Sequence, residues 1–326
     1  MDIIPGGTVI PGETAAGFNI PTTLTAAGSP YYYYCVVSSP AAADAASNVA
    51  RVNVNAPATY TVTFVSNGGT AVSPITGVSN GATITAPTPP AKTGYDCKFA
   101  GWYGDIGLTS IFVFTTAITG NTTLYAKWEA YSLGDTGPGG GFIFFVADGV
   151  GFLADGSTPK PYGFTFYETA ADVTGITSNY LEAAPNDISG YQQWAAANFL
   201  IPGLSDYALS DESDFAIGRG MKNTAIIIAD AAYNSYTAAA ASECVAPYDA
   251  GGSKTDWFLP SKDELAELYK LYEAKGWGTY GNLTTNWYWS SSQNSTANAW
   301  YQSFTSGSQT NVIKVFTYSV RAVRAF

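Results

Sequence analysis

Residues 287–326 read WYWSSSQNSTANAWYQSFTSGSQTNVIKVFTYSVRAVRAF, and this stretch decides how the C-terminal part of the chain is interpreted. The chain of 326 residues has a formal charge of −11, yet this stretch contains no Asp or Glu, and its only charges are Lys314, Arg321 and Arg324. Tyr, Trp, Phe, Ser, Asn and Gly dominate it. Flat aromatic groups give contact area at low entropic cost, and small polar groups adapt to a partner. The composition therefore indicates strands that also carry a binding surface.

Residues 300–305 alternate in the way expected of a β-strand, whose side chains point to opposite faces in turn. The even-numbered residues, which end at Phe304, form the face that we expect to pack inward. Tyr301, Ser303 and Thr305 form the face that we expect to meet solvent. An amphipathic strand in an ordinary antiparallel sheet would show the same alternation, so the pattern alone leaves both a structural and a binding role open.

The bulk composition limits the partners. Hydrophobic residues make up 46% and charged residues 12%, and the chain has 34 Gly, 23 Tyr and 17 Pro, which suits packed cores with short strands and many turns. The acidic balance argues against nucleic acid and anionic membranes as partners. No apolar run approaches the roughly 18–20 residues of a membrane-spanning helix. Residues 1–5 lack the features of a signal peptide, so we expect this start to lie inside a longer exported protein.

The residue inventory predicts no catalytic centre, no metal site and no cofactor. His is absent, which removes the commonest general base and metal ligand. Cys35, Cys97 and Cys244 fall in different segments without metal-binding spacing, and we expect each to be a small buried hydrophobe. The acidic cluster of Asp211, Glu212 and Asp214 is interpreted as a solvated loop, with a cation site as the alternative.

Residues 1–56 contain two short strand signals, at residues 31–38 and 48–54. The spacing of Tyr33 and Cys35 before the second strand resembles the last two strands of a bacterial immunoglobulin-like module with its tyrosine corner. We expect a truncated immunoglobulin-like β segment here.

Residues 57–130 combine alternating strand patterns with Asn-Gly turns. This unit resembles the Listeria–Bacteroides repeat, a β-grasp-like module that serves as a spacer or interaction domain on bacterial surface proteins. The matching sequences are F-x-x-N-G-G at 64–69, G-Y at 94–95, G-W-Y at 101–103 and T-L-Y-A-K-W at 123–128. We expect its aromatic residues to lie in the core.

The third segment, residues 131–326, opens with the glycine-rich sequence LGDTGPGGG at 133–141. No G-K-[S/T] follows, and residues 142–146 read as a buried strand, so nucleotide binding is excluded. A helix is predicted from about 222 to 241, and a second helix begins at Ser261 with a capping box and ends at Gly276.

Residues 180–193 are predicted to be mostly irregular, and a set of strands ends the chain. One early strand, two helices and terminal strands predict an α+β architecture.

This third segment also resembles a known group, the variable proteins of diversity-generating retroelements, most closely the treponemal variable-protein type. The group is built on a C-type lectin fold close to that of formylglycine-generating enzymes. The matching sequences are LGDTGPGGGFIF at 133–144, YLEAAP at 180–185, DWFLPSKDEL at 256–265, YWSSS at 288–292, AWxQxF at 299–304 and VRAVRAF at 320–326. The resemblance implies a C-type lectin fold ligand-binding domain over 131–326 with a variable region at 287–326.

In that group, error-prone reverse transcription alters adenines in a template copy. Asparagine codons of the AAY kind then change to many others but never to Trp, Lys, Gln, Glu or Met. The resemblance implies that positions between the matching sequences vary and bind ligand. These positions are Ser295, Thr296, Ala297, Asn298, Tyr301, Ser303, Thr305, Ser306, Ser308, Thr310, Asn311, Val312, Ile313, Val315, Phe316, Thr317 and Tyr318, and none carries an excluded residue.

The excluded residue types occur at positions that we assign to the fixed scaffold. These are Gln293, Trp300, Gln302, Gln309 and Lys314, and Trp287 is assigned with them. Tyr301, Phe316 and Tyr318 are the expected anchors, because buried aromatic side chains contribute most to many interfaces.

Other uses of the fold are disfavoured. Formylglycine-generating enzymes need a reactive cysteine pair, and Cys244 is alone in this segment. The sequence Ala184-Pro185-Asn186 is the nearest match to a calcium-dependent sugar site but lacks the leading carboxylate, and Ca²⁺ requires oxygen ligands.

We therefore expect a non-catalytic protein that is displayed on the bacterial cell surface, where an upstream part of the chain anchors it. It would bind an unknown protein or other surface ligand. An invariant adhesin or cell-wall module of the same fold is the alternative.

Overall fold

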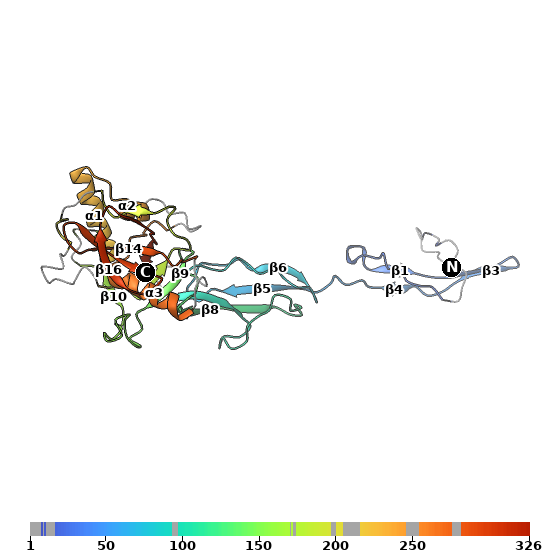
Figure 1. Ribbon diagram of the computed structural model, residues 1–326. Coiled ribbons are helices and arrows are strands. Elements are labelled where there is room, and N and C mark those ends of the chain that lie inside the picture. The colour runs from blue at the N-terminus through green and yellow to red at the C-terminus, as the bar shows by residue number, and fades with distance from the viewer. Residues whose placement is uncertain are drawn as a thin grey trace. The chain divides into compact units, whose positions relative to one another are not determined.

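The computed structural model of the protein describes residues 8, 10, 17–92, 97–169, 171, 174–196, 200–204, 216–245, 254–275 and 282–326. The chain divides into two units, one made of residues 1–91 and 99–127 and the other of residues 92–98 and 128–326. The described residues are mostly β, with three α-helices, all in the second unit (Figure 1).

The first unit begins with short strands that pair antiparallel, β1 with β4 and β2 with β3. Their bounds, with one turn of 3₁₀ helix, are η1 Ala26–Gly28, β1 Tyr31–Tyr33, β2 Val36–Ser39, β3 Ala42–Ala46 and β4 Ala50–Val52. The single strand predicted at 31–38 is thus two strands. The hydroxyl of Tyr31 accepts from the backbone N–H of Thr25 at 2.9 Å and donates to its carbonyl at 3.0 Å. The hydrogen bond from a tyrosine hydroxyl to upstream backbone that marks a tyrosine corner was expected for Tyr33, and here Tyr31 makes it.

The rest of the first unit centres on a four-stranded sheet of order β6-β5-β8-β7, in which β5 and β8 are parallel. The strands are β5 Thr59–Val65, β6 Ile75–Ser79, β7 Cys97–Tyr103 and β8 Thr122–Ala130. Trp102 is buried with its ring 4.8 Å from that of Phe64, so these aromatics are core residues, as expected. Asn67 has a positive φ of 48° and donates its side-chain amide to Ala126 O at 2.7 Å, which explains Asn at this turn.

The second unit contains several small sheets. The three-stranded sheet β18-β12-β9 and the three-stranded sheet β14-β15-β16 are the largest, and β10 pairs with β11 and β13 with β17. The bounds are β9 Phe142–Val146, β10 Phe164–Phe166, β11 Ile176–Ser178, β12 Tyr180–Ala183, β13 Gln192–Gln193, β14 Trp287–Gln293, β15 Asn298–Ser303, β16 Gln309–Ile313, β17 Thr317–Tyr318 and β18 Val323–Ala325. The region 180–193, expected to be mostly irregular, therefore contributes β12, the middle strand of its sheet.

The glycine-rich loop at 137–141 binds a carboxylate of the protein itself. The carboxylate of Glu182, on β12, accepts hydrogen bonds from Gly139 N at 3.0 Å and Gly141 N at 2.7 Å. A Cβ on Gly141 would lie 2.0 Å from the carbonyl oxygen of Ala183, so only glycine fits against the strand there. The loop has the backbone donors of an anion-binding loop, and an internal anion occupies them.

The helices are α1 Gly220–Asn234, α2 Ala239–Val245 and α3 Lys262–Lys275. The single helix predicted over 222–241 was wrong, because Ser235 takes a left-handed conformation and ends α1. The capping box of α3 is confirmed: Glu264 N donates to Ser261 Oγ at 3.2 Å, and Ser261 N donates to the Glu264 carboxylate at 2.7 Å. Gly276, the predicted end of this helix, lies outside the described residues.

Candidate ligand-binding face

Strands β14, β15 and β16 form an antiparallel sheet with β16 at one edge. The register pairs Trp289 with Tyr301 and Tyr301 with Thr310, so these three side chains share one face. Trp300 pairs with Asn311 on the other face. Trp289 belongs to a buried cluster, and Tyr301 packs partly against it.

The three charged side chains of residues 287–326 all point inward. Lys314 is 0% exposed, and its ammonium group donates to Gln293 Oε1 at 2.7 Å and to Thr296 O at 3.0 Å. The same group lies 4.9 Å from the ring of Trp194. A buried ammonium needs such partners, because its desolvation is otherwise costly.

Arg321 and Arg324 are buried as well. Arg321 pairs with Asp187 at 2.6 Å, and Arg324 pairs with Glu182 at 3.0 Å and Asp256 at 2.8 Å. Burial opposes the charge on Asp256, yet its bonds to Arg324 outweigh that effect and lower the pKa of Asp256. The outward side of the segment is therefore free of charge.

The predicted variable positions, with the exception of Ser303, are not buried. The half-buried ones are Ser295, Ala297, Asn298, Tyr301, Asn311, Val312 and Tyr318, and the exposed ones are Thr296, Thr305, Ser306, Ser308, Thr310, Ile313, Val315, Phe316 and Thr317. Around the buried Lys314, the neighbouring Ile313, Val315 and Phe316 have 41%, 36% and 50% of their surface exposed. This local arrangement buries the charge and exposes the apolar groups.

The expectation for Ser303 was wrong, since only 5% of it is exposed. The turn after β15 folds back over it: Gly307 N donates to its carbonyl at 2.8 Å, and Ser306 Oγ donates to its hydroxyl at 3.1 Å. Trp300, expected to pack inward, is half-buried, and the Lys262 ammonium lies 4.7 Å from its ring. The simple alternation fails at these two positions because a tight turn and a helix cover the sheet unevenly.

Aromatic side chains gather beside β17. The ring of Tyr318 lies 4.9 Å from that of Tyr301 and 5.3 Å from that of Trp287. Burial, with Tyr301 close by, raises the pKa of Tyr318, so its hydroxyl stays neutral and can donate a hydrogen bond. A pocket of about 280 Å³ opens here, lined by Tyr191, Thr285, Asn286, Trp287, Thr305, Thr317 and Tyr318. We call it the aromatic pocket.

Sequence reasoning missed part of the aromatic pocket. Trp287 was assigned to the scaffold, yet 51% of it is exposed, and Tyr191 is exposed as well. The sequence offers a weak signal for Trp287, which follows a polar run in an aromatic-rich stretch. It offers none for Tyr191, which lies almost a hundred residues earlier.

The predicted anchors differ in their surroundings. Tyr301 and Tyr318 both pack against the buried ring of Trp289, at 6.3 Å and 4.7 Å between ring centroids. They therefore support the core as well as the surface, while Phe316 projects from a turn closed by its own N–H to Ile313 O at 3.0 Å. Phe316 and Trp287 are the cleaner probes of a binding role.

The predicted positions form a strip and not a compact patch. Ser295, Thr296 and Ala297 precede β15, whereas Ser306 and Ser308 follow it, so the six residues of the strand separate the two groups. At about 3.3 Å per residue, that strand spans roughly 20 Å. Phe316 lies on the segment after β16, and so do Thr317 and Tyr318, two of the residues that line the aromatic pocket.

The described residues also bear on the expectations for metal ligands and cysteines. Among them, no group of three or more Cys, Asp or Glu side chains is arranged to hold a metal ion. Asp211, Glu212 and Asp214 lie outside the described residues. Cys244 is buried, which raises the pKa of its thiol, but Cys35 is exposed and Cys97 half-buried, contrary to expectation. None of the described helices is long and apolar enough to cross a membrane.

Two family models match parts of the chain. Residues 60–127 match the Listeria–Bacteroides repeat domain, which confirms the predicted repeat, and residues 218–324 match the Lcl C-terminal domain. The second match covers α1 to α3 and nearly all of the candidate face.

Two curated proteins of Evansella cellulosilytica are similar over shorter stretches. One, described as a Gly-rich membrane protein, is 35% identical over 117 residues, which are 35% of this chain and 13% of that protein. The other, described as a membrane protein, is 44% identical over 71 residues, 22% of this chain and 10% of that protein. The chain thus spans about a tenth of the length of the curated relatives it matches.

Among solved structures, a fimbrial protein from Bacteroides ovatus is 10% identical, with a TM-score of 0.39, over 90% of this chain and 75% of that chain.

Proposed function

We propose that the chain is a surface-displayed, non-catalytic binding protein whose C-terminal face recognises varying ligands. In this proposal residues 131–326 adopt a C-type lectin fold of the treponemal variable-protein type, and residues 287–326 are diversified by a retroelement. The repeat at 57–130 and the β segment at 1–56 act as spacers. The match to the Lcl C-terminal domain supports a ligand-binding surface domain of bacterial origin.

One observation carries the proposal. Residues 287–326 bury all three of their charges and expose an uncharged set of aromatic, aliphatic and hydroxyl side chains. Ordinary surface segments do the reverse, because Lys and Arg are rarely buried and exposed apolar clusters are unfavourable without a partner. A segment that tolerates exchange of its outward residues must fix itself through its inward residues, and Lys314, Arg321 and Arg324 provide that fixation.

Two randomised libraries test the proposal. In the first, exposed positions such as Thr310, Val315, Phe316 and Thr317 are encoded by codons ending in a pyrimidine. In the second, an equal number of buried positions, including Gln293, Gln302 and Lys314, is encoded in the same way. We expect most members of the first library to keep the wild-type melting temperature and some to bind protein targets to which the parent does not bind. The second library should mostly unfold. Equal loss of folding in both libraries would contradict a binding face.

An invariant adhesin or cell-wall module is the second candidate. Tyr191 and Trp287 favour it, because they line the aromatic pocket from outside the predicted variable set. The gene neighbourhood separates the two candidates. A near-copy of the sequence encoding residues 287–326, with adenines at the mismatched positions and a reverse transcriptase gene beside it, supports diversification, and their absence supports the invariant adhesin.

A further inference from the structure

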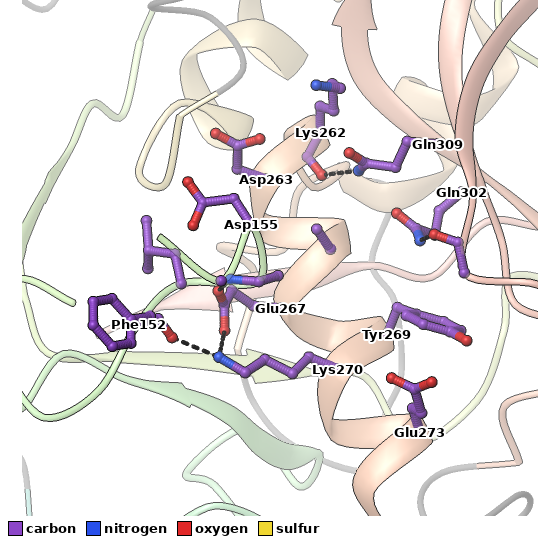
Figure 2. A pocket seen from close by; sticks show the side chains of 15 residues that line it. Phe152, Asp155, Lys262, Asp263, Glu267, Tyr269, Lys270, Glu273, Gln302 and Gln309 are labelled. Atoms are coloured by element: carbon purple, nitrogen blue, oxygen red, sulfur yellow. Dashed lines mark hydrogen bonds and ion pairs between the residues drawn. The ribbon is translucent and has the colours of Figure 1, made fainter. Parts of the chain in front are cut away.

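A second concave site lies away from the aromatic pocket, along helix α3. This groove, of about 670 Å³, runs between α3, the loop of residues 152–156 and the turn between β15 and β16. Figure 2 shows α3 in the middle, with Asp155 and Asp263 on the loop side and Tyr269, Glu273 and Gln302 on the strand side. We call it the α3 groove. None of its lining residues belongs to the predicted variable set.

The nitrogen donors of the groove lining are already engaged within the protein. The ammonium of Lys270 donates to Phe152 O at 2.5 Å, and that of Lys262 lies 4.7 Å from the Trp300 ring. The side-chain amides of Gln302 and Gln309 donate to Gly307 O and Lys262 O, both at 2.6 Å. The groove therefore has few donors left for a ligand.

The carboxylates of Asp155 and Glu267 accept hydrogen bonds from backbone N–H groups of residues 154–158, but one described acceptor of the lining, on Gln302, is left without a donor. Only 2% of this residue is exposed, and the bond to Gly307 O fixes which way its amide points. Its Oε1 atom then has no hydrogen-bond partner within the described residues. The side chain reaches from β15 toward α3, into the groove (Figure 2). A buried acceptor without a donor is costly, and a ligand that donates to it would remove that cost.

The net charge of the lining is negative and therefore favours a cationic ligand as well. Four carboxylates, those of Asp155, Asp263, Glu267 and Glu273, face two ammonium groups, which leaves a formal charge of −2. Hydrogen bonds from Thr158 and Ser157 lower the pKa of Asp155 to about 2, so it is charged at any physiological pH. The exposed ring of Phe152 lies at one edge. The groove thus offers negative charge, acceptors and an aromatic face.

We propose that the α3 groove binds a guanidinium side chain from a basic segment of a partner protein. The guanidinium group has five N–H donors and no acceptor and is always charged, which matches the unpartnered Gln302 Oε1 and the net negative charge of the lining. No lining residue belongs to the predicted variable set, so the groove has the same residues whether or not those positions are diversified. The proposal does not depend on retroelement diversification.

The test uses the full chain, labelled with ¹⁵N, and the peptide acetyl-Arg-Arg-Arg-Arg-amide as probe. A peptide with citrulline at all four positions keeps the shape but removes the charge. We expect the arginine peptide to shift the resonances of residues 153–156, of α3 and of the Gln302 side-chain amide. The citrulline peptide should not. Equal binding of both peptides, or shifts confined to the aromatic pocket, would overturn the proposal.

Matched variants locate the effect. The double variant Asp263→Asn with Glu273→Gln removes one half-buried and one exposed carboxylate from α3, and we expect it to weaken arginine-peptide binding roughly tenfold. The control Glu243→Gln removes one charge from the exposed side of α2, outside the groove, and should change the affinity less than about twofold. The control removes one carboxylate and the double variant two, so a control that weakens binding by half as many logarithmic units as the double variant, or more, would reduce the effect to net charge and overturn the site.

The variant Gln302→Met tests the unpartnered acceptor with a side chain of similar volume. It should weaken arginine-peptide binding while the melting temperature is followed in parallel. If this variant fails to fold, the double variant on α3 still decides the question.

Discussion

The inward and outward sides of residues 287–326 differ more than two sides of a strand set usually do. The inward side carries Lys314, Arg321 and Arg324, each with named oxygen partners, together with the buried ring of Trp289. The outward side carries no charge. Polar contacts of the inward side therefore hold this segment in the domain, and among the outward residues Tyr301 and Tyr318 also pack against Trp289.

Arg324 should give the largest effect of any change on the inward side. Arg324→Ala leaves the fully buried Glu182 without its cation, which we expect to cost about 3–5 kcal/mol in the free energy of unfolding. Denaturant unfolding of the second unit measures it. Arg324→Lys should fall between wild type and the alanine variant, because one ammonium cannot replace bonds to both Glu182 and Asp256. A loss below about 1 kcal/mol for Arg324→Ala would mean that the inward charges do not hold the segment.

Lys314 and Phe316 provide a matched pair two residues apart. Lys314→Met keeps the aliphatic stem but removes the donor to Gln293 and Thr296, and should cost about 1–3 kcal/mol. Phe316→Ala removes an exposed side chain and should cost less than about 0.5 kcal/mol. Thermal unfolding of both variants measures the contrast. Similar losses in the free energy of unfolding for the two variants would contradict the difference between the inward and outward residues.

Glu264, on helix α3, predicts how the stability of the same domain depends on pH. Burial raises its pKa to about 7, although hydrogen bonds from Ser261 and Gly218 favour the charged form. Because the folded pKa lies above the unfolded value, the folded state binds the proton more tightly. The stability from this group is complete below the unfolded pKa and is lost as pH rises through about 7.

We therefore expect the free energy of unfolding to fall between about pH 5 and pH 7, and Glu264→Gln to reduce that fall. Urea unfolding at several pH values provides the measurement. An equal pH dependence in wild type and variant would assign it to other groups.

Trp287 tests the outward side through ligand affinity. Half of this side chain is exposed, so Trp287→Ala should cost well under the loss seen for Arg324, while any ligand that enters the aromatic pocket should bind at least about tenfold more weakly. The substitution is made in a member of the first library, and calorimetric titration measures the affinity of that member for its protein target with and without Trp287→Ala. Unchanged affinity would exclude the aromatic pocket from the binding face.

Short sequence motifs correctly predicted elements whose formation depends on neighbouring residues. The capping box placed α3, the apolar run placed β9, and the Asn-Gly-Gly turn followed from backbone conformations that glycine and asparagine adopt easily. The alternation of residues 300–305 predicted a strand, and β15 covers residues 298–303.

Contacts between distant residues could not be predicted from the sequence. Glu182 occupies the glycine-rich loop from more than forty residues away, and Tyr191 joins Trp287 in one pocket across almost a hundred residues. Ser303 was assigned to the surface because period-2 alternation ignores the turn that folds back over it. The break at Ser235 depends on a single residue in a left-handed conformation within an alanine-rich run that otherwise favours helix.

The position of β18 in the chain determines what happens to products of stop codons or frameshifts that arise before it. Val323–Ala325 completes the sheet beside β12, and Arg321 and Arg324 neutralise Asp187 and Glu182, yet all of them are encoded after the outward-facing segment. A ribosome that meets a stop codon or a shifted reading frame within that segment cannot make them. Such a product lacks β18 and the two buried arginines. We expect it to fold poorly and to be degraded, so that only variants translated in frame to the end of this segment accumulate.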